Sequence, residues 1–148
     1  MKIKYYCPLW GSEDLGFDEF CTKVKEAGYH GIEMSFPMDP VEKSRMLKTI
    51  VRHDLSYIAQ HWETRTPDSA EHKKAYVERL HNLASCDPKF INTHTGRDFF
   101  SFEQNMELIH LAEEVSKETG VAVYHETHRG RFGFAAHIAL TFMEAKPD

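Results

Sequence analysis

The 148-residue sequence has no apolar run of about 18 residues, the length that a membrane-spanning helix needs. Its opening stretch, MKIKYYCPLWGSEDLG, also has no apolar core of the kind found in secretory signal peptides. The chain has three cysteines, an odd number, and their spacing matches no metal-binding pattern. We therefore expect a cytoplasmic protein that spans no membrane and keeps its cysteines reduced.

The sequence also has no excess of positive charge. The formal net charge is −5 at pH 7, whereas proteins that bind nucleic-acid phosphates usually have a basic excess. No G-x-G-x-x-G run follows the first expected strand, and neither a Ser-His-Asp arrangement nor a nucleophile elbow is present. These absences disfavour nucleic-acid binding, dinucleotide binding and catalysis by a serine nucleophile.

The composition that remains is that of one globular domain over residues 1–148. Hydrophobic residues make up 41% and charged residues 28%, which is typical of a folded chain. Ten histidines are many for this length, and histidine is the commonest metal ligand and proton carrier near neutral pH.

Strand-like and helix-like segments alternate along the chain. We expect strands over residues 2–7, 30–35, 55–62, 89–96 and 121–126, and helices over 17–28, 39–53, 69–85, 101–120 and 134–145. Asp39 is a helix N-cap, Ser101 and Gln104 form a capping box, and Gly28 and Gly120 end helices. A βα unit that repeats about every 30 residues predicts a parallel sheet with right-handed crossovers.

Polar residues gather where the strands end. One face of the third strand carries Tyr57, Ala59 and His61; the fourth carries Phe90, Asn92 and His94; the fifth carries Ala122, Tyr124, Glu126 and His128. Glu33 lies at the matching end of the second strand. Such strands are typical of a barrel with a packed interior and a functional mouth, although open α/β sheets also bind ligands at this end. The missing glycine-rich fingerprint favours the barrel.

We interpret Glu33, His61, His94 and Glu126 as one shared site. Taken singly, each histidine would more often be a buried, hydrogen-bonded residue, and Glu126 could simply pair with Arg129. All four residues, however, fall at equivalent ends of their strands, and chance is the weaker explanation for that arrangement. His61, His94 and Glu126 would suit zinc or manganese, and the carboxylate also admits magnesium. Alternatively, Glu126 could act as a base for a proton beside a carbonyl group.

Four segments in order carry a resemblance. GYHGIEM (28–34), YIAQHW (57–62), FINTHTG (90–96) and VYHETHRGRF (123–132) resemble the xylose-isomerase-like TIM-barrel superfamily, especially its sugar phosphate isomerase/epimerase members. The resemblance covers essentially the whole chain. It implies an α/β fold of the (β/α) barrel type, a divalent metal at the barrel mouth, and proton transfer beside the carbonyl of a sugar or sugar phosphate.

The resemblance also implies roles for single residues. Glu126 corresponds to the fifth-strand glutamate, a metal ligand and acid/base candidate. His61 and His94 match strand-end histidines that bind zinc in the related apurinic-site endonucleases and more often contact substrate in the sugar isomerases. The residues expected to contact the substrate are Glu33, Trp10, His128 and Arg129.

The chain departs from the family in the number of strands. The family has eight strands in about 250 residues, whereas five are expected here, and the Asp, His and Glu ligands of the sixth to eighth strands have no counterpart. We expect a partial barrel, weak metal binding, little or no turnover by the chain alone, and pairing with a second copy through open edges. Two alternatives are an apurinic-endonuclease-like phosphodiesterase, which the negative charge disfavours, and a non-catalytic remnant that binds a ligand or partner.

Overall fold

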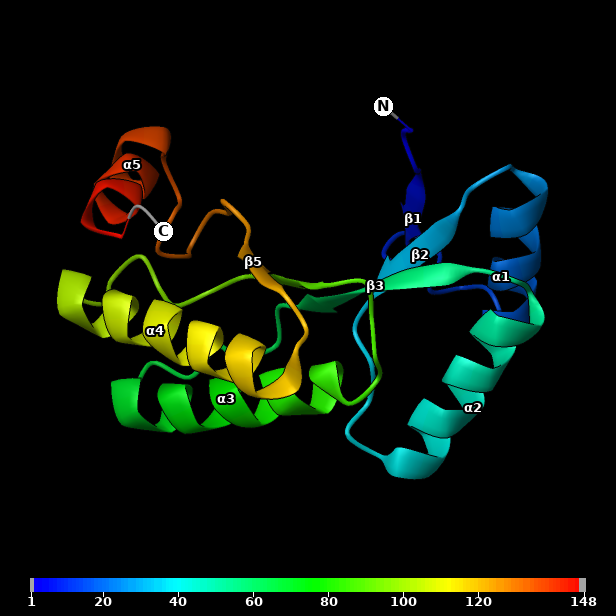
Figure 1. Ribbon diagram of the computed structural model, residues 1–148, viewed down its shortest axis with the longest axis horizontal. Helices are drawn as coiled ribbons and strands as arrows, with labels where there is room; N and C mark the ends of the chain where they lie inside the picture. Colours follow the sequence, from blue (N-terminus) through cyan, green and yellow to red (C-terminus); the bar gives the residue numbers. More distant parts are fainter. Residues whose placement is uncertain (1, 147–148) are drawn as a thin grey trace.

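The computed structural model describes residues 2–146 as five consecutive βα units (Figure 1). The strands are β1 (Tyr6–Pro8), β2 (Gly31–Met34), β3 (Ser56–His61), β4 (Ile91–Thr93) and β5 (Val123–His125). The helices are α1 (Phe17–Glu26), α2 (Pro40–Arg52), α3 (Ser69–Ala84), α4 (Phe102–Thr119) and α5 (Ala136–Ala145). The predicted order of elements is confirmed, with strands shorter than expected. None of the helices described is long and apolar enough to cross a membrane.

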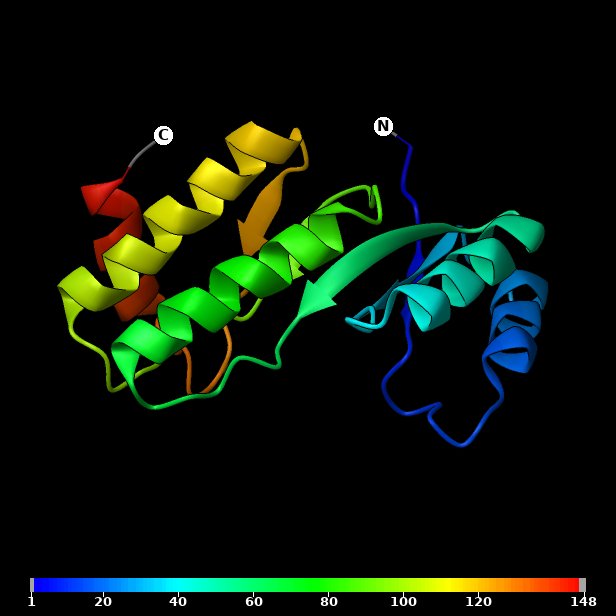
Figure 2. The same cartoon turned by 90° about the horizontal axis from the view of Figure 1, so that it is seen from below.

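The order of the strands decides between the two candidate architectures. All neighbours are parallel, and the sheet order β1-β2-β3-β4-β5 follows the chain. In a doubly wound sheet the order in which strands are added along the sheet reverses at a switch point. The order of the described strands has no such reversal. Because right-handed crossovers in one direction place every helix on the same side, α1 to α4 cover a single face of the curved sheet (Figures 1 and 2). The predicted partial TIM barrel is confirmed.

Local signals at the helix ends work as the sequence predicts. The Asp39 side chain accepts a hydrogen bond from the Glu42 backbone N–H, and both halves of the Ser101/Gln104 capping box are present. Gly120 ends α4 in the left-handed conformation, with φ of 73°. These contacts span four residues or fewer, so the local sequence is enough to predict them.

The core lies between the sheet and helices α1 to α4. It is built from Ile32, Met34, Ala59 and Ile91 of the strands and from Phe20, Ile50, Tyr76, Leu80, Leu83, Leu108 and Ala112 of the helices. Burying each large apolar side chain contributes about 1.5–3 kcal/mol. A smaller cluster attaches α5, where Phe142 packs on Phe102 and Phe132 with ring centroids 4.7 Å apart in both pairs. The other face of the sheet, here called the open face, carries the polar residues described next.

Candidate functional site

Strand register determines which side chains share the open face. Gln60 of β3 pairs with Asn92 of β4, while His61 pairs with Thr93 and, through it, with His125 of β5. Paired residues on adjacent strands point to the same face, and successive residues alternate. Gln60 and Asn92 therefore lie on the open face, and His61 lies on the face that the helices cover.

The structure does not bring His61 to His94 and Glu126, so the predicted three-residue metal site is corrected. His61 is fully buried, and its ring nitrogens contact the hydroxyls of Thr93 (Nδ1, 2.9 Å) and Thr64 (Nε2, 2.7 Å). Burial lowers the pKa of His61 to about 3, which keeps the ring neutral. The predicted alternation is one residue out of phase in β3, and Gln60 takes the position assigned to His61.

Asn92 joins the two carboxylates of the open face. Its amide nitrogen donates to Glu33 Oε1 at 2.8 Å and to Glu126 Oε2 at 2.7 Å. A side-chain amide has two N–H hydrogens, so each glutamate receives one. The Glu126 side chain remains 34% exposed, which leaves it accessible to a ligand. The structure thus brings Glu33 and Glu126 together as predicted, through a residue from the strand between them.

His94 completes this group beside Glu126. Its Nε2 lies 3.3 Å from Glu126 Oε2 and, within residues 2–146, forms no hydrogen bond. Its ring stacks on His128 with centroids 4.2 Å apart. Burial lowers the pKa of His94, while the nearby Glu126 carboxylate acts in the opposite direction. The predicted proximity of His94, Glu126 and His128 is present in the structure.

These side chains line a hollow of about 790 Å³ at the carboxyl ends of the strands. Its lining is Trp10, Gln60, Trp62, Arg65, His94, Arg97, Glu126, His128, Arg129, Gly130 and Arg131. Five predicted site residues are therefore in one place, Glu33 reaches it through Asn92, and His61 does not. The volume suits a small molecule.

Several lining residues were missed from the sequence. Trp62 and Arg65 follow β3, Arg97 follows β4, and Arg131 follows β5. The available signal was their position, because the loops after barrel strands build the active sites of this architecture. The positive charge of the three arginines did not by itself mark them as site residues, because the chain has a net negative charge.

Arg131 connects two of these loops through hydrogen bonds to their backbones. Its side chain is 4% exposed and donates to the backbone oxygens of Thr64 (2.9 Å), Trp62 (2.6 Å) and Gly96 (3.4 Å). Burial lowers the pKa of Arg131 to about 10, so it stays charged at neutral pH. The loop after β3 and the loop after β4 are thereby held against each other.

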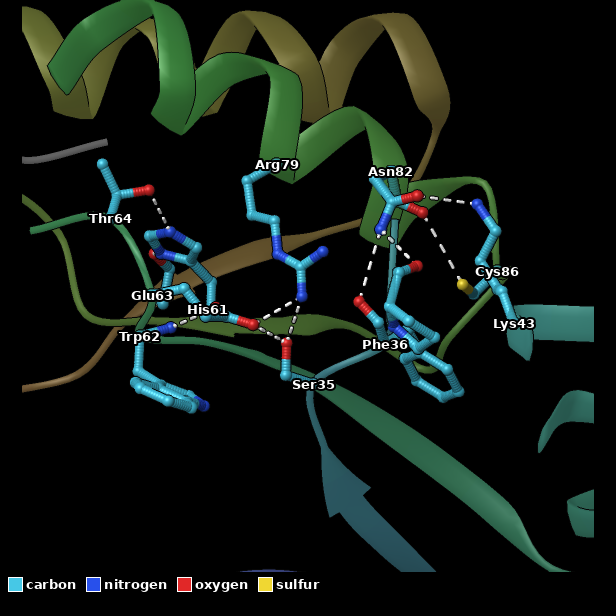
Figure 3. Close-up of polar contacts among 12 residues, drawn as sticks. Ser35, Phe36, Lys43, His61, Trp62, Glu63, Thr64, Arg79, Asn82 and Cys86 are labelled. Atoms are coloured by element: carbon cyan, nitrogen blue, oxygen red, sulfur yellow. Dashed lines mark hydrogen bonds and ion pairs between the residues drawn. The ribbon is translucent and has the colours of Figure 1, made fainter. Parts of the chain in front are cut away.

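A second polar cluster holds the loop after β3 on its other side (Figure 3). Glu63 accepts hydrogen bonds from Ser35, from Arg79 of α3 and from the backbone N–H of Trp62, the last at 2.9 Å. Burial raises the pKa of Glu63, but the Ser35 and Arg79 hydrogen bonds outweigh it and the net shift is downward. The ionised Glu63 fixes the backbone at Trp62 and leaves the indole free to line the hollow.

The neutral histidines on the covered face predict sensitivity to acid. Burial lowers the pKa of His61 to about 3 and that of His125 to about 4, from 6.5. A lowered folded-state pKa stabilises the protein above pH 6.5 and loses that contribution as the pH falls towards 4. Between pH 7 and 5 we expect His61 alone to reduce the free energy of unfolding by about 2 kcal/mol, and His125 to add to this.

Urea unfolding at both pH values measures this loss. Replacing His61 with Gln should make the free energy of unfolding depend less steeply on pH, whereas replacing the exposed His110 of α4 with Gln should leave the slope unchanged. Equal slopes in the His61 variant and the unmodified chain would contradict the assignment of neutral His61.

No family model and no curated protein matches the sequence. Solved structures do match its fold. The 3-keto-D-glucoside 4-epimerase YcjR of E. coli has a TM-score of 0.72 at 16% identity, over 97% of this chain and 64% of that chain. The probable 3-DHS dehydratase AsbF of Bacillus anthracis has a TM-score of 0.67 at 17% identity, over 99% and 60%.

A sugar phosphate isomerase/epimerase from Parabacteroides distasonis has a TM-score of 0.59 at 11% identity, over 85% of this chain and 56% of that chain. The chain thus spans 56–64% of the length of these three structures. At such identities the likeness concerns the fold. The chain has the fold of part of a TIM barrel, and these three structures share that fold.

Proposed function

We propose that the protein is a sugar isomerase/epimerase-like enzyme that moves a proton on a carbon beside a sugar carbonyl group. The observation that carries this proposal is the pair of hydrogen bonds from Asn92 to Glu33 and Glu126, at 2.8 and 2.7 Å, next to His94. A positioned carboxylate at the mouth of a barrel is suited to general acid/base catalysis. The names of two structural neighbours, an epimerase and an isomerase/epimerase, describe reactions of this kind.

Glu126 is the proposed acid/base. Within residues 2–146, its contacts with Asn92 and His94 both use Oε2, so Oε1 is the oxygen that a substrate proton would meet. His128 and Arg129 line the same hollow and would orient the substrate, with Trp10 forming part of the wall. Glu33 would act indirectly, by fixing the Asn92 amide.

A divalent metal, manganese, zinc or magnesium, remains part of the proposal. No three histidine, cysteine, aspartate or glutamate side chains among the residues described are placed to hold an ion. His94 Nε2 is buried and has no hydrogen-bond partner within residues 2–146, so it and Glu126 fit two ligand positions. A bound metal would polarise the substrate carbonyl oxygen. With two protein ligands we expect weak binding, and the roles given to Glu126 and Asn92 do not depend on it.

Exchange of substrate hydrogens with solvent tests the proposal, because it detects proton transfer even when the reaction is far slower than normal enzyme turnover. The chain is incubated in D₂O with sugar phosphates and keto sugars, with each metal or with chelator, and proton NMR follows the hydrogens of the substrate. We expect slow, protein-dependent exchange confined to the carbon beside the carbonyl. Exchange at the buffer rate with every substrate and metal would contradict the proposed function.

We also propose that the chain forms a homo-oligomer through its strand edges. In the described part of the chain β5 pairs with β4 alone, and exposed Tyr124 and Tyr5 lie near the two ends of the sheet. Ala122 and Glu126 bond to β4, so the alternation turns the N–H groups of Val123 and His125 towards the free edge. Unpaired strand edges are templates for a second chain.

Light scattering measures this association directly. A dimer should have twice the 17.2 kDa mass of the chain at micromolar concentration. Val123→Pro removes an outward N–H without touching the bonds to β4, so it should shift the dimer towards monomer. A monomeric unmodified chain at this concentration would refute the proposal.

A further inference from the structure

Positive charge is concentrated in the hollow. Four of the seven arginines in the sequence line it: Arg65, Arg97, Arg129 and Arg131. Glu126 is the acidic residue among the lining side chains, in a chain whose net charge is −5. Within residues 2–146, none of the four arginines forms an ion pair with a carboxylate, although Arg52 and Arg79 elsewhere do.

The backbone around Arg97 is held rigidly by α4. Asn105 accepts from the Arg97 backbone N–H at 3.2 Å and donates to its carbonyl oxygen at 2.9 Å. Gly96 has φ of +60°, and a Cβ atom there would lie 2.0 Å from Asn105 Oδ1, so only glycine fits. The Arg97 guanidinium carbon lies 5.1 Å from the ring centroid of Phe99. The Arg97 backbone and guanidinium group are therefore already positioned in the ligand-free structure.

Arg65 also has an aromatic ring beside its guanidinium group. Its guanidinium carbon lies 5.0 Å from the centroid of the Trp62 ring, a cation–π arrangement. The backbone at Trp62 is fixed by Arg131 and by Glu63. Both guanidinium groups are therefore supported by aromatic rings and leave their N–H groups for other partners.

Among the residues described, no carboxylate pairs directly with any of the four arginines. Arg131 has a lowered pKa because of burial first, and then because of the charges on Arg97 and Arg65. The Nε of Arg97 is buried and has no hydrogen-bond partner among the residues that the structure describes. Like charges that repel each other and an unused buried donor both cost free energy, and a bound anion would relieve both.

We infer that the hollow binds an anionic group, a phosphate ester or a carboxylate carried by the substrate, through the guanidinium groups of Arg65, Arg97 and Arg129. Guanidinium groups bind both anions with paired, charge-assisted hydrogen bonds. Arg131 supports the loops, and both of its terminal nitrogens already donate to backbone oxygens. The inference rests on the proposed function only in taking the hollow as the place where the substrate sits.

Intrinsic fluorescence reports on this site directly, because both tryptophans of the chain, Trp10 and Trp62, line the hollow. The probes are inorganic phosphate, glucose 6-phosphate, gluconate and uncharged glucose. We expect saturable changes with phosphate and with at least one of the charged sugars, weakened by added salt, and no change with glucose at the same concentration. If glucose 6-phosphate binds more tightly than gluconate, the natural anion is assigned as a phosphate ester. If gluconate binds more tightly, it is assigned as a carboxylate.

Charge-removing variants test the residues. Arg97→Gln and Arg65→Gln should each weaken anion binding by about tenfold or more, since each removes a charge-assisted contact. The matched control is Arg45→Gln, which replaces an exposed arginine of α2 away from the hollow and should bind like the unmodified chain. Circular dichroism confirms that each variant is folded.

Failure of this inference differs from failure of the proposed function. Glu126→Gln should keep anion binding intact or tighten it, because it removes a negative charge from the hollow. Saturable anion binding without any proton exchange would uphold the inference and overturn the proposed function. Absence of anion binding, binding unchanged in both arginine variants, or glucose bound as tightly as the charged sugars would overturn the inference.

Discussion

Replacing Glu126 with Gln should lower the rate of proton exchange beside the substrate carbonyl by about 100-fold or more. A positioned general base contributes roughly 10²–10⁴ to such a step, and an amide cannot accept the proton. Gln keeps the size of the side chain, and its oxygen can still accept from Asn92, so the hollow should keep its shape. The NMR exchange assay in D₂O measures the rate for both proteins.

The control for this prediction is Glu114→Gln, on the exposed surface of α4. It makes the same chemical change outside the hollow and should exchange protons at the unmodified rate. A second variant, Asn92→Ala, leaves Glu126 in place but removes the donor that positions it, so we expect a partial loss. Exchange that continues at the full rate in Glu126→Gln would remove Glu126 from the mechanism.

Replacing Arg131 with Met should lower the free energy of unfolding by about 3 kcal/mol. The substitution keeps an apolar stem but leaves the backbone oxygens of Thr64, Trp62 and Gly96 without their buried donor. Relief of the repulsion with neighbouring arginines acts in the opposite direction and limits the loss. Urea unfolding at pH 7 measures the difference.

Arg129→Met is the matched control, because this arginine lies two residues away and is exposed. Its free energy of unfolding should change by no more than about 0.5 kcal/mol. Both variants should bind anions more weakly, but for different reasons. Arg129→Met removes a contact with the anion, whereas Arg131→Met loosens the loops that carry Arg65 and Arg97. Equal stability of the two variants would contradict the structural role of Arg131.

The alternation of strands and helices was predictable because its signals are local. The N-cap at Asp39, the capping box at Ser101 and the glycine stop at Gly120 each act within a few residues of chain. The polar strand ends were visible for the same reason, since the carboxyl end of each strand is known once its direction is known. Parallel strands then place those ends at one edge, which is why Glu126, His94 and His128 were placed together correctly.

The sequence alone thus determined the βα repeat and the end of the sheet where polar residues gather, and five of the predicted residues line the hollow at that end. The tertiary structure decided the face on which each strand-end residue lies, because register depends on pairing between residues some thirty positions apart and a shift of one residue exchanges the faces. It placed Gln60 on the open face and buried His61 under α3. The tertiary structure also brought together arginines from the loops after β3, β4 and β5. These loops are far apart in the sequence and meet only when the chain is folded.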